Sequence, residues 1–182
     1  MKYLIASDIH GSAHYTKQLL LAFEKERADK LILLGDIYSH GPRNALPKEY
    51  SPMEVSALLN AVKDRLIVIK GNCDSQVDEM ISDFDFINGV CLNFGDKTAY
   101  LTHGHEYNKD KPTKTKFDLV IYGHFHVGEI EDKDGAVYIC VGSVALPKNQ
   151  SPRSYLTIED GEIILKSLDG EIINQIKIQE LN

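Results

Sequence analysis

Short apolar runs that lack polar alternation constrain this chain more than any other feature. Five of them occur, at residues 3–6, 31–34, 66–69, 99–101 and 119–122. A strand whose successive side chains are all apolar buries both of its faces, because neighbouring side chains point to opposite sides of the sheet. The runs therefore predict strands that are covered on both sides.

Two helices are predicted between the first three runs. Ser12 precedes apolar residues at positions 19, 20, 22 and 23, a spacing that predicts an amphipathic helix capped by Ser12. A second helix is predicted from Pro52 or Met53 to about Lys63, with Ser51 as its cap and the proline in its first turn. The order strand, helix, strand predicts right-handed crossovers and a parallel sheet.

The second half of the chain has a different character, because turn dipeptides lie between its short β-type runs. These dipeptides are Gly95-Asp96, Asp134-Gly135, Asp160-Gly161 and Asp169-Gly170. Such dipeptides are typical of β-hairpins, so the sheet structure is expected to become antiparallel towards the C-terminus. We expect one domain, residues 1–182, with an α/β fold of the four-layer type: two mixed sheets packed face to face with flanking helices.

Composition limits the binding partners and the cellular location that are expected for the protein. The net charge of -7 argues against broad binding to nucleic acid or to an acidic membrane. No apolar run approaches the roughly 20 residues of a membrane-spanning helix, and Asp8 and His10 interrupt the apolar start, so no secretion signal is expected. The three cysteines, Cys73, Cys91 and Cys140, form no C-x-x-C pair. Reduced thiols in the cytoplasm are the expectation.

Each predicted strand is followed by side chains of the kinds that bind metals. They are Asp8 and His10, Asp36, Asn72, His103, and His124 with His126. Singly, each has an ordinary interpretation: Asp8 as a helix cap, Asp36 in a strand-ending turn, Asn72 in a left-handed turn. Ligands of open α/β sheets bind outside the carboxyl ends of the strands, so these side chains are expected to converge. Together they predict a metal site.

The order of these motifs resembles the calcineurin-like metallophosphoesterases, which share the pattern D-x-H, G-D, G-N-x-D, G-H and G-H-x-H. Here the motifs are Asp8-Ile9-His10, Gly35-Asp36, Gly71-Asn72-Cys73-Asp74, His103-Gly104-His105 and Gly123-His124-Phe125-His126. The resemblance covers nearly the whole chain. The segments 35–36, 40–44 and 71–74 are more narrowly similar to small bacterial phosphodiesterases of the YfcE type.

The resemblance implies a binuclear centre in which each metal has its own set of ligands and one ligand is shared. One metal would be held by Asp8, His10, Asp36 and His126, and the other by Asp36, Asn72, His103 and His124, so that Asp36 bridges. Carboxylate, amide and imidazole together suit manganese, iron, zinc, cobalt or nickel better than magnesium, and manganese is expected first. A water between two such cations becomes hydroxide and attacks a phosphodiester in line, without a protein nucleophile.

The resemblance also assigns catalytic roles to Asn72, Cys73 and His103, and Cys73 is a departure from the pattern. The broader superfamily usually has histidine at this position, where it protonates the leaving oxygen. A thiol with a pKa of about 8.5 is a weaker match for neutral catalysis than an imidazole at about 6.5. We therefore expect a bias towards esters with acidic leaving groups. The alternative is that Cys73 is a small buried filler.

Other side chains are candidates for positions around the site. His40 and Arg43 lie in a long proline-containing loop and are candidates to contact phosphate, with an exposed loop charge as the alternative for Arg43. Asp74 is expected either to orient a ligand such as His124 or to cap a helix beginning near Ser75. His105 either lines the pocket or faces solvent. The loop lysines 109, 111, 114 and 116 are interpreted as a solvated face rather than as a funnel for anions.

A small phosphodiester is the expected substrate, and the alternatives come from different classes. One is a phosphomonoesterase acting on a metabolite or phosphoprotein. Another is a protein-binding scaffold of the same fold, against which the complete set of ligands argues, because inward-facing polar groups without metal cost stability. No membrane partner is expected, and the lack of an aromatic and basic platform disfavours a nucleic-acid polymer. A homodimer is compatible with base rates alone.

Overall fold

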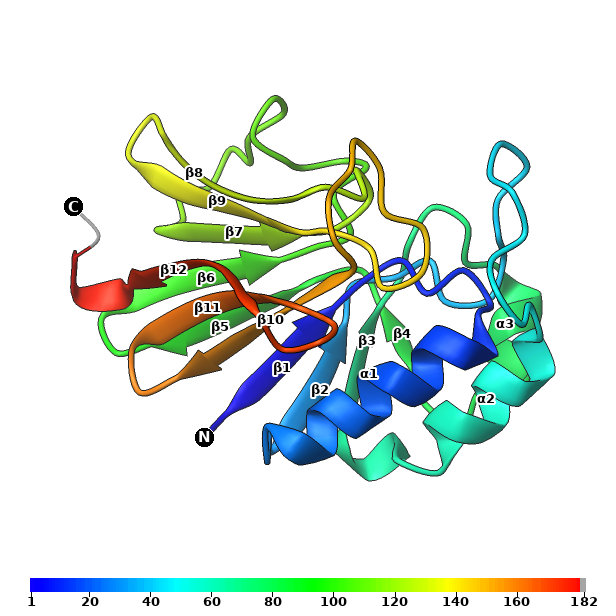
Figure 1. The fold of residues 1–182 in the computed structure, drawn as a ribbon. Coiled ribbons are helices and arrows are strands. Elements are labelled where there is room, and N and C mark those ends of the chain that lie inside the picture. Colours follow the sequence, from blue (N-terminus) through cyan, green and yellow to red (C-terminus); the bar gives the residue numbers. More distant parts are fainter. Residues whose placement is uncertain (181–182) are drawn as a thin grey trace.

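Two mixed β-sheets pack face to face in the computed structural model, which describes residues 1–180 (Figure 1). The larger sheet consists, in spatial order, of β12 (Ile172–Lys177), β11 (Glu162–Ser167), β10 (Ser154–Glu159), β1 (Tyr3–Ala6), β2 (Lys30–Leu33), β3 (Leu66–Ile69) and β4 (Phe86–Ile87). The smaller consists of β5 (Val90–Phe94), β6 (Lys97–Leu101), β7 (Leu119–Tyr122), β9 (Ala136–Val141) and β8 (Gly128–Lys133). The predicted pair of mixed sheets is confirmed.

Parallel pairing dominates the centre of both sheets, and hairpins add the antiparallel strands. Strands β1 to β4 are parallel to one another, as are β6, β7 and β9. The four predicted turn dipeptides all connect antiparallel neighbours: β5 to β6, β8 to β9, β10 to β11, and β11 to β12. The expected change from parallel to antiparallel pairing along the chain is therefore confirmed.

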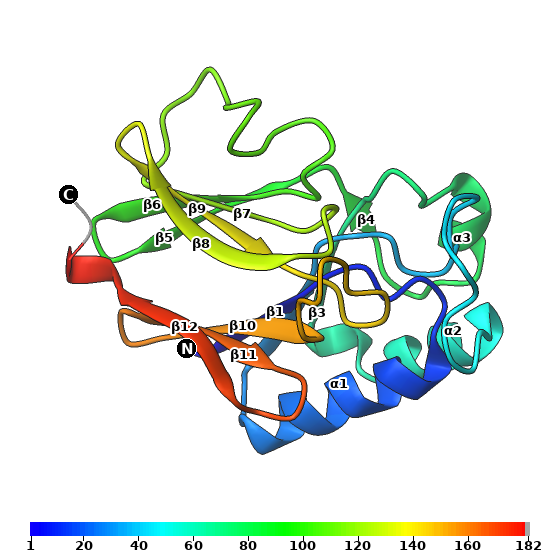
Figure 2. The ribbon, with the colours of Figure 1, turned by 45° about the horizontal axis from the view of Figure 1, so that its top comes forward.

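The long helices α1 (Ala13–Lys25) and α2 (Pro52–Asn60) lie side by side on the outer face of the larger sheet (Figures 1 and 2). Ser12 caps α1 as predicted, since its hydroxyl accepts the Tyr15 N–H at 3.3 Å. Pro52 begins α2 with Ser51 at the N-cap position, as predicted, although the side chain of Ser51 makes no cap hydrogen bond. Its backbone N–H is instead tied to the Gly11 carbonyl at 2.8 Å.

Shorter helical segments complete the fold. Helix α2 ends sooner than predicted, and the 3-10 turn η1 (Lys63–Arg65) then leads into β3. A one-turn helix, α3 (Gln76–Met80), follows β3, and the 3-10 turn η2 (Ile178–Glu180) follows β12. Within residues 1–180, no helix combines the length and apolar character needed to cross a bilayer.

The helices flank one sheet only. The outer face of the smaller sheet carries Val120, Tyr122 and Tyr138, and Phe117 from the preceding loop packs against them. This loop, between β6 and β7, is long and lies over that face in both views (Figures 1 and 2). The fourth layer is thus formed by loop rather than helix, because the lysine-, threonine- and proline-containing segment 109–116 has no apolar face that a helix could bury.

Strand β1 shows why the predicted strands lack polar alternation. Leu4 and Ala6 belong to the core between the larger sheet and the helices, together with Leu19 and Phe23 of α1. Ile5 points the other way, into the core between the two sheets. Because a central strand of the larger sheet has apolar layers on both sides, polar side chains can enter only where the strand ends. The functional residues are found at those ends.

Candidate metal centre

The loops that follow the parallel strands meet at one end of the two sheets (Figures 1 and 2). The loops after β1 and β2 run together, since the Asp8 N–H donates to the Gly35 carbonyl at 3.1 Å and the His10 N–H to the Asp36 carbonyl at 2.9 Å. The two sheets are joined here as well, because the His124 N–H donates to the Asp8 carboxylate at 2.9 Å. The strand ends thus form one continuous site.

Left-handed backbone is concentrated at this site. Five side chains predicted as metal ligands have positive φ angles: Asp8 (59°), His10 (50°), Asp36 (56°), His124 (66°) and His126 (63°). Residues other than glycine rarely adopt this conformation, which costs about 1–3 kcal/mol and collects at functional sites. A Cβ atom on Gly123 would lie 2.6 Å from an Asp8 carboxylate oxygen, so only glycine fits between the two loops.

Backbone carbonyls determine the tautomers of three histidines. The Nδ1 atom of His10 donates to Ser39 O at 2.7 Å, that of His103 to Leu34 O at 2.6 Å, and that of His126 to Leu146 O at 2.6 Å. With the proton on Nδ1, each neutral ring presents the lone pair of Nε2 to the centre of the site. This arrangement is the usual one for histidines that bind metals.

One group of ligand atoms surrounds Asp8. Its buried Oδ1 atom accepts no hydrogen bond, yet it lies 3.1 Å from His126 Nε2 and 3.4 Å from His10 Nε2. The two Nε2 atoms are themselves 3.2 Å apart. Lone pairs at these distances repel one another unless a proton or a metal ion lies among them. The donor set therefore fits a metal ion.

A second group lies around His103. Its Nε2 atom is 3.0 Å from Asn72 Oδ1, 3.3 Å from His124 Nδ1 and 3.4 Å from Asp36 Oδ1. The other oxygen of Asp36, Oδ2, lies 3.7 Å from His10 Nε2 in the first group. Asp36 thus stands between the two groups with one oxygen directed to each. The structure brings all seven predicted metal ligands together in two adjoining clusters.

The ionised Asp8 carboxylate supplies negative charge that favours a cation, and the shifted histidines differ in their protonation. Although burial opposes ionisation, contacts with His10 and His126 hold the pKa of Asp8 well below its usual range. Burial likewise opposes protonation of His10, but the adjacent Asp8 carboxylate raises the pKa of its imidazole. Burial and the neighbouring His103 lower the pKa of His124 to about 4, so its lone pair is free at neutral pH.

A cavity of about 760 Å³ opens beside the clusters. Its lining comprises His10, Asp36, Ser39, Gly41, Pro42, Arg43, Asn44, Asn72, Cys73, His124, Phe125, His126 and Lys148. The volume lies within the range of small-molecule sites. Five of the seven predicted metal ligands, all except Asp8 and His103, thus border a space that can hold more than a phosphate group.

Comparison with known proteins agrees with this geometry. Residues 1–161 match the family described as Calcineurin-like phosphoesterase superfamily domain. Phosphodiesterase YfcE of Escherichia coli K12 is 38% identical over 183 residues, covering 98% of each chain.

The chain belongs to the calcineurin-like phosphoesterase superfamily. It is a metal-dependent phosphoesterase, and so a hydrolase.

Other similarities agree with this membership. A solved structure of the E. coli phosphoesterase YfcE matches with a TM-score of 0.93 and 36% identity, covering 98% of this chain and 100% of that one. The probable metallophosphoesterase YsnB of Bacillus subtilis is 26% identical over 93% of this chain and 91% of its own. Vps29 of Entamoeba histolytica, solved with Zn²⁺, shares the fold at 18% identity and a TM-score of 0.65, covering 98% and 99%.

Cys73 of this phosphoesterase lines the cavity. Its backbone N–H donates to Asp36 Oδ1 at 2.9 Å, and its sulfur accepts from the Asn72 amide at 3.3 Å. Burial and the Asp36 carboxylate raise the pKa of the thiol to about 12. A half-buried thiol beside the ligand atoms does not fit the interpretation as a buried filler.

Asp74 orients a predicted metal ligand, as one of the two expectations had it, but the ligand is Asp36 and the contact is to its backbone. Its carboxylate accepts the N–H groups of Asp36 at 2.8 Å, Ile37 at 2.8 Å and Gly71 at 2.7 Å. Asp74 therefore fastens the loop after β2 to the loop after β3, and it neither orients His124 nor caps α3. Burial raises the pKa of Asp74 to about 6 against the effect of these backbone donors.

The two predicted substrate-binding residues, His40 and Arg43, differ in their position relative to the cavity. Arg43 lines the cavity, held in a turn where the Asn44 N–H donates to Gly41 O at 3.2 Å. His40 lies outside the lining, with its ring 5.3 Å from that of Tyr50, so its interpretation as a phosphate contact does not fit the structure.

The structure also shows the positions of His105 and of the four loop lysines. His105 is only partly exposed, and its ring lies 5.4 Å from that of His103, outside the cavity lining. Lys109 pairs with Glu129 and Glu131, both at 2.7 Å, and so fastens its loop to β8. The three remaining loop lysines are exposed, as a solvated face requires.

Sequence reasoning missed Phe125 and Lys148, which both line the cavity. Phe125 stands inside the G-H-x-H motif at the position that the motif leaves open. Lys148 lies in a loop after β9 that carries no metal ligand and no recognisable motif. The proximity of Lys148 to His126, whose carbonyl accepts the Lys148 N–H at 3.0 Å, is the only signal, and it is a tertiary one.

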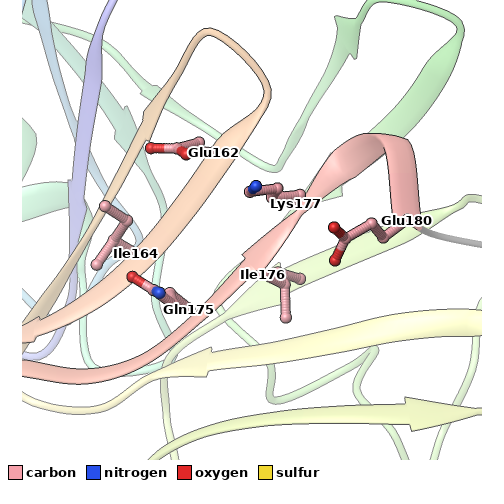
Figure 3. A pocket seen from close by; sticks show the side chains of 6 residues that line it. All are labelled: Glu162, Ile164, Gln175, Ile176, Lys177 and Glu180. Atoms are coloured by element: carbon pink, nitrogen blue, oxygen red, sulfur yellow. The ribbon is translucent and has the colours of Figure 1, made fainter.

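A second hollow, of about 120 Å³, lies away from the metal centre. It is lined by Glu162, Ile164, Gln175, Ile176, Lys177 and Glu180 from β11, β12 and η2 (Figure 3). No histidine lines it, and its volume is far below that of a small-molecule site. The catalytic function is therefore assigned to the larger cavity.

Proposed function

We propose that this phosphoesterase is a phosphodiesterase that uses two transition-metal ions, with Mn²⁺ the first candidate, to hydrolyse small phosphodiesters. The observation that carries the proposal is the cavity of about 760 Å³ beside two adjoining ligand clusters. A diester needs room for an ester group on each side of the phosphorus, whereas a monoester needs room on one side. The similarity to Phosphodiesterase YfcE of Escherichia coli supports the same substrate class.

Two ions would be held by the two clusters, one by Asp8, His10 and His126 and the other by Asn72, His103 and His124, with Asp36 shared. Imidazole nitrogens together with carboxylate and amide oxygens suit Mn²⁺ and its neighbours better than Mg²⁺. When bound, such ions supply positive charge to the phosphoryl oxygens and increase the acidity of a water molecule.

The side chains of the protein have their own tasks in this proposal. The carbonyl-bonded histidines and the Asp74 clamp keep the ligand atoms in place before substrate arrives, which lowers the cost of reorganisation. Arg43 can grip a phosphoryl oxygen from the cavity wall. Cys73 retains its proton at neutral pH and so is a weak proton donor to the leaving oxygen.

The cysteines and the net charge bear on the cellular location of the enzyme and on the size of its substrate. We assign it to the cytoplasm, because its three cysteines are unpaired. The net charge of -7 and the lack of a basic and aromatic platform in the sequence favour a small substrate over a nucleic-acid polymer or a membrane. A homodimer stays a prediction from base rates.

The test is a metal-reconstitution assay. Protein stripped with a chelator is given Mn²⁺ and assayed on bis-p-nitrophenyl phosphate and on p-nitrophenyl phosphate. We expect metal-dependent cleavage, faster on the diester, and a fall of about 10²–10³-fold or more in Asp36→Asn, the scale for losing a dominant electrostatic stabiliser.

Asp134→Asn is the matched control. Asp134 has the same left-handed backbone, with φ of 55°, but it lies exposed in the β8–β9 turn. It should retain full activity. Faster cleavage of the monoester would assign the site to phosphomonoesters instead, and folded protein that is inactive with every transition metal would favour a scaffold.

A further inference from the structure

Phe125 is an exposed aromatic side chain in an otherwise polar part of the molecule. Its exposed fraction is 42%, and it lies between the metal-ligand candidates His124 and His126. Of the exposed large hydrophobic residues within 1–180, Phe125 alone lines the cavity. Single exposed apolar side chains are common on protein surfaces, but one at a substrate cavity is available for contact with the ligand.

The ring is held in position by its neighbours. The Phe125 N–H donates to the Gly123 carbonyl at 2.7 Å, and the residues on either side have left-handed backbone. Its ring lies 5.2 Å from that of His124 and 6.0 Å from that of Tyr122, at interplanar angles of 82° and 81°. Both contacts are perpendicular, so no ring in the described part of the chain is stacked on Phe125.

Lys148 shares the cavity with this ring. Its backbone is fixed, because its N–H donates to the His126 carbonyl at 3.0 Å and its carbonyl accepts the Ser151 N–H at 2.9 Å. Lys109, by contrast, is neutralised by two glutamates, whereas no carboxylate among residues 1–180 pairs with the Lys148 ammonium. The cavity therefore offers a flat apolar surface and a free cation together.

We propose that Phe125 forms the subsite for the ester group that stays on phosphorus, and that this group is a planar aromatic or heteroaromatic one. The inference rests on the proposed phosphodiesterase function. In an in-line displacement the leaving group departs on the side of phosphorus opposite the attacking water. Because Phe125 lines the cavity together with the ligand candidates His124 and His126, its ring is on the metal side of the cavity, where an ester group retained on phosphorus would lie. Lys148 contributes a positive charge to the same part of the cavity.

Two diesters with the same leaving group test the proposal. Bis-p-nitrophenyl phosphate retains an aryl group after hydrolysis, and methyl p-nitrophenyl phosphate retains a methyl group. Stacking on an aromatic side chain strengthens the binding of a planar group by about tenfold or more. In Phe125→Leu we therefore expect the ratio of kcat/KM between the aryl and methyl diesters to fall about tenfold, chiefly through KM. Phe125→Trp should keep the ratio near that of the wild type, because it retains an aromatic ring.

Tyr107→Leu provides the matched control, since Tyr107 is exposed to 38% but does not line the cavity, and it should leave the ratio unchanged. A second readout is independent of turnover. The chain contains no tryptophan, so Phe125→Trp introduces a single fluorophore at the subsite. With Mn²⁺ bound, diphenyl phosphate should change its emission at concentrations where dimethyl phosphate does not.

The possible results distinguish a failure of the Phe125 subsite from a failure of the proposed phosphodiesterase function. An unchanged ratio in Phe125→Leu, or an equal loss on both diesters, would overturn the stacking subsite while the phosphodiesterase function stands. Wild-type protein that hydrolyses neither diester would overturn the proposed function and this inference with it. A tenfold fall together with an aryl-specific change in emission supports the subsite.

Discussion

The loops of the metal centre leave the ends of the central strands, whereas strands β10 to β12 extend the larger sheet beside β1. The two regions differ in how backbone and side chains are arranged. In the loops, Asp8 and His10 have left-handed backbone, and the buried Asp8 Oδ1 accepts no hydrogen bond. In the strands, left-handed residues occur at the turn Asp160-Gly161, where a hairpin favours them. Buried Ile163 and Leu165 alternate there with more exposed neighbours.

The difference indicates where the protein places strain and where it gains stability. Ligand atoms with facing lone pairs and uncommon backbone angles destabilise the metal-free loops, and they are held by the surrounding sheets. Strands β10 and β11 pair with each other and bury apolar surface between the sheets, so they stabilise the fold without contributing to the chemistry. Changes in the two regions should therefore separate activity from stability.

The largest effect is expected from metal removal. A ligand that binds only the folded state at 1,000 times its dissociation constant stabilises that state by about 4.1 kcal/mol for each site. Chelation should therefore lower the free energy of unfolding by several kcal/mol, which urea denaturation with and without Mn²⁺ measures. Asp36→Asn should remove most of this dependence. Equal stability with and without metal would mean that the clusters do not bind it tightly.

A core substitution in β11 should have the opposite pattern. Leu165 is fully buried between the sheets, and Leu→Ala changes in such cores cost about 2–5 kcal/mol. In Leu165→Ala we expect that loss in denaturant unfolding, together with an unchanged kcat/KM at temperatures where the protein is folded. Retained metal stabilisation in the same variant would sharpen the separation. A parallel fall in kcat/KM would contradict it.

Cys73→His should alter selectivity within the site. General acid catalysis contributes about 10²–10⁴-fold where the leaving oxygen needs a proton, and an imidazole is a better donor at neutral pH than this thiol. We expect at least about a tenfold rise on diesters with alkyl leaving groups and little change on p-nitrophenyl esters. Rates across a leaving-group series measure the slope. An identical slope in both proteins would show that Cys73 has no role as proton donor.

The smallest effect is expected at Glu26, where α1 ends against the C-terminal strands. Burial opposes its charge, but Lys166, Lys2 and Tyr155 hydrogen-bond to it and lower its pKa to about 2. A depressed carboxyl pKa stabilises the fold above the unfolded value of 4.5, and the contribution disappears as pH falls from there to about 2.

Glu26→Gln should therefore lower the free energy of unfolding by about 1 kcal/mol at pH 7, allowing for screening by solvent. The difference between wild type and variant should vanish near pH 2, and kcat/KM should not change. Denaturation curves measured between pH 7 and pH 2 provide the check. A difference that persists at pH 2 would show that size or packing, rather than charge, explains the effect.

Much of the fold could be predicted because its signals are local. The runs at residues 3–6, 66–69 and 119–122 are strands with those bounds, and the four turn dipeptides form hairpins. Ser12 caps its helix because the capping bond spans only three residues. Ser51 stands at the predicted N-cap position of its helix without a side-chain cap bond, and its backbone N–H donates to the distant Gly11 carbonyl. The side on which helices pack also depended on distant contacts.

The sequence by itself determined the strands, the turns and the kinds of side chain at each strand end. Apolar runs, turn dipeptides and the residues that follow each strand are all local features, which neighbouring positions in the chain determine. Only the tertiary structure decided which ligand atoms face one another, such as Asp36 between His10 and His103. It also decided that Asp74 fastens two loops and that Lys148 enters the cavity. These relations join residues far apart in sequence, and they arise only when the two sheets pack and their carboxyl ends meet.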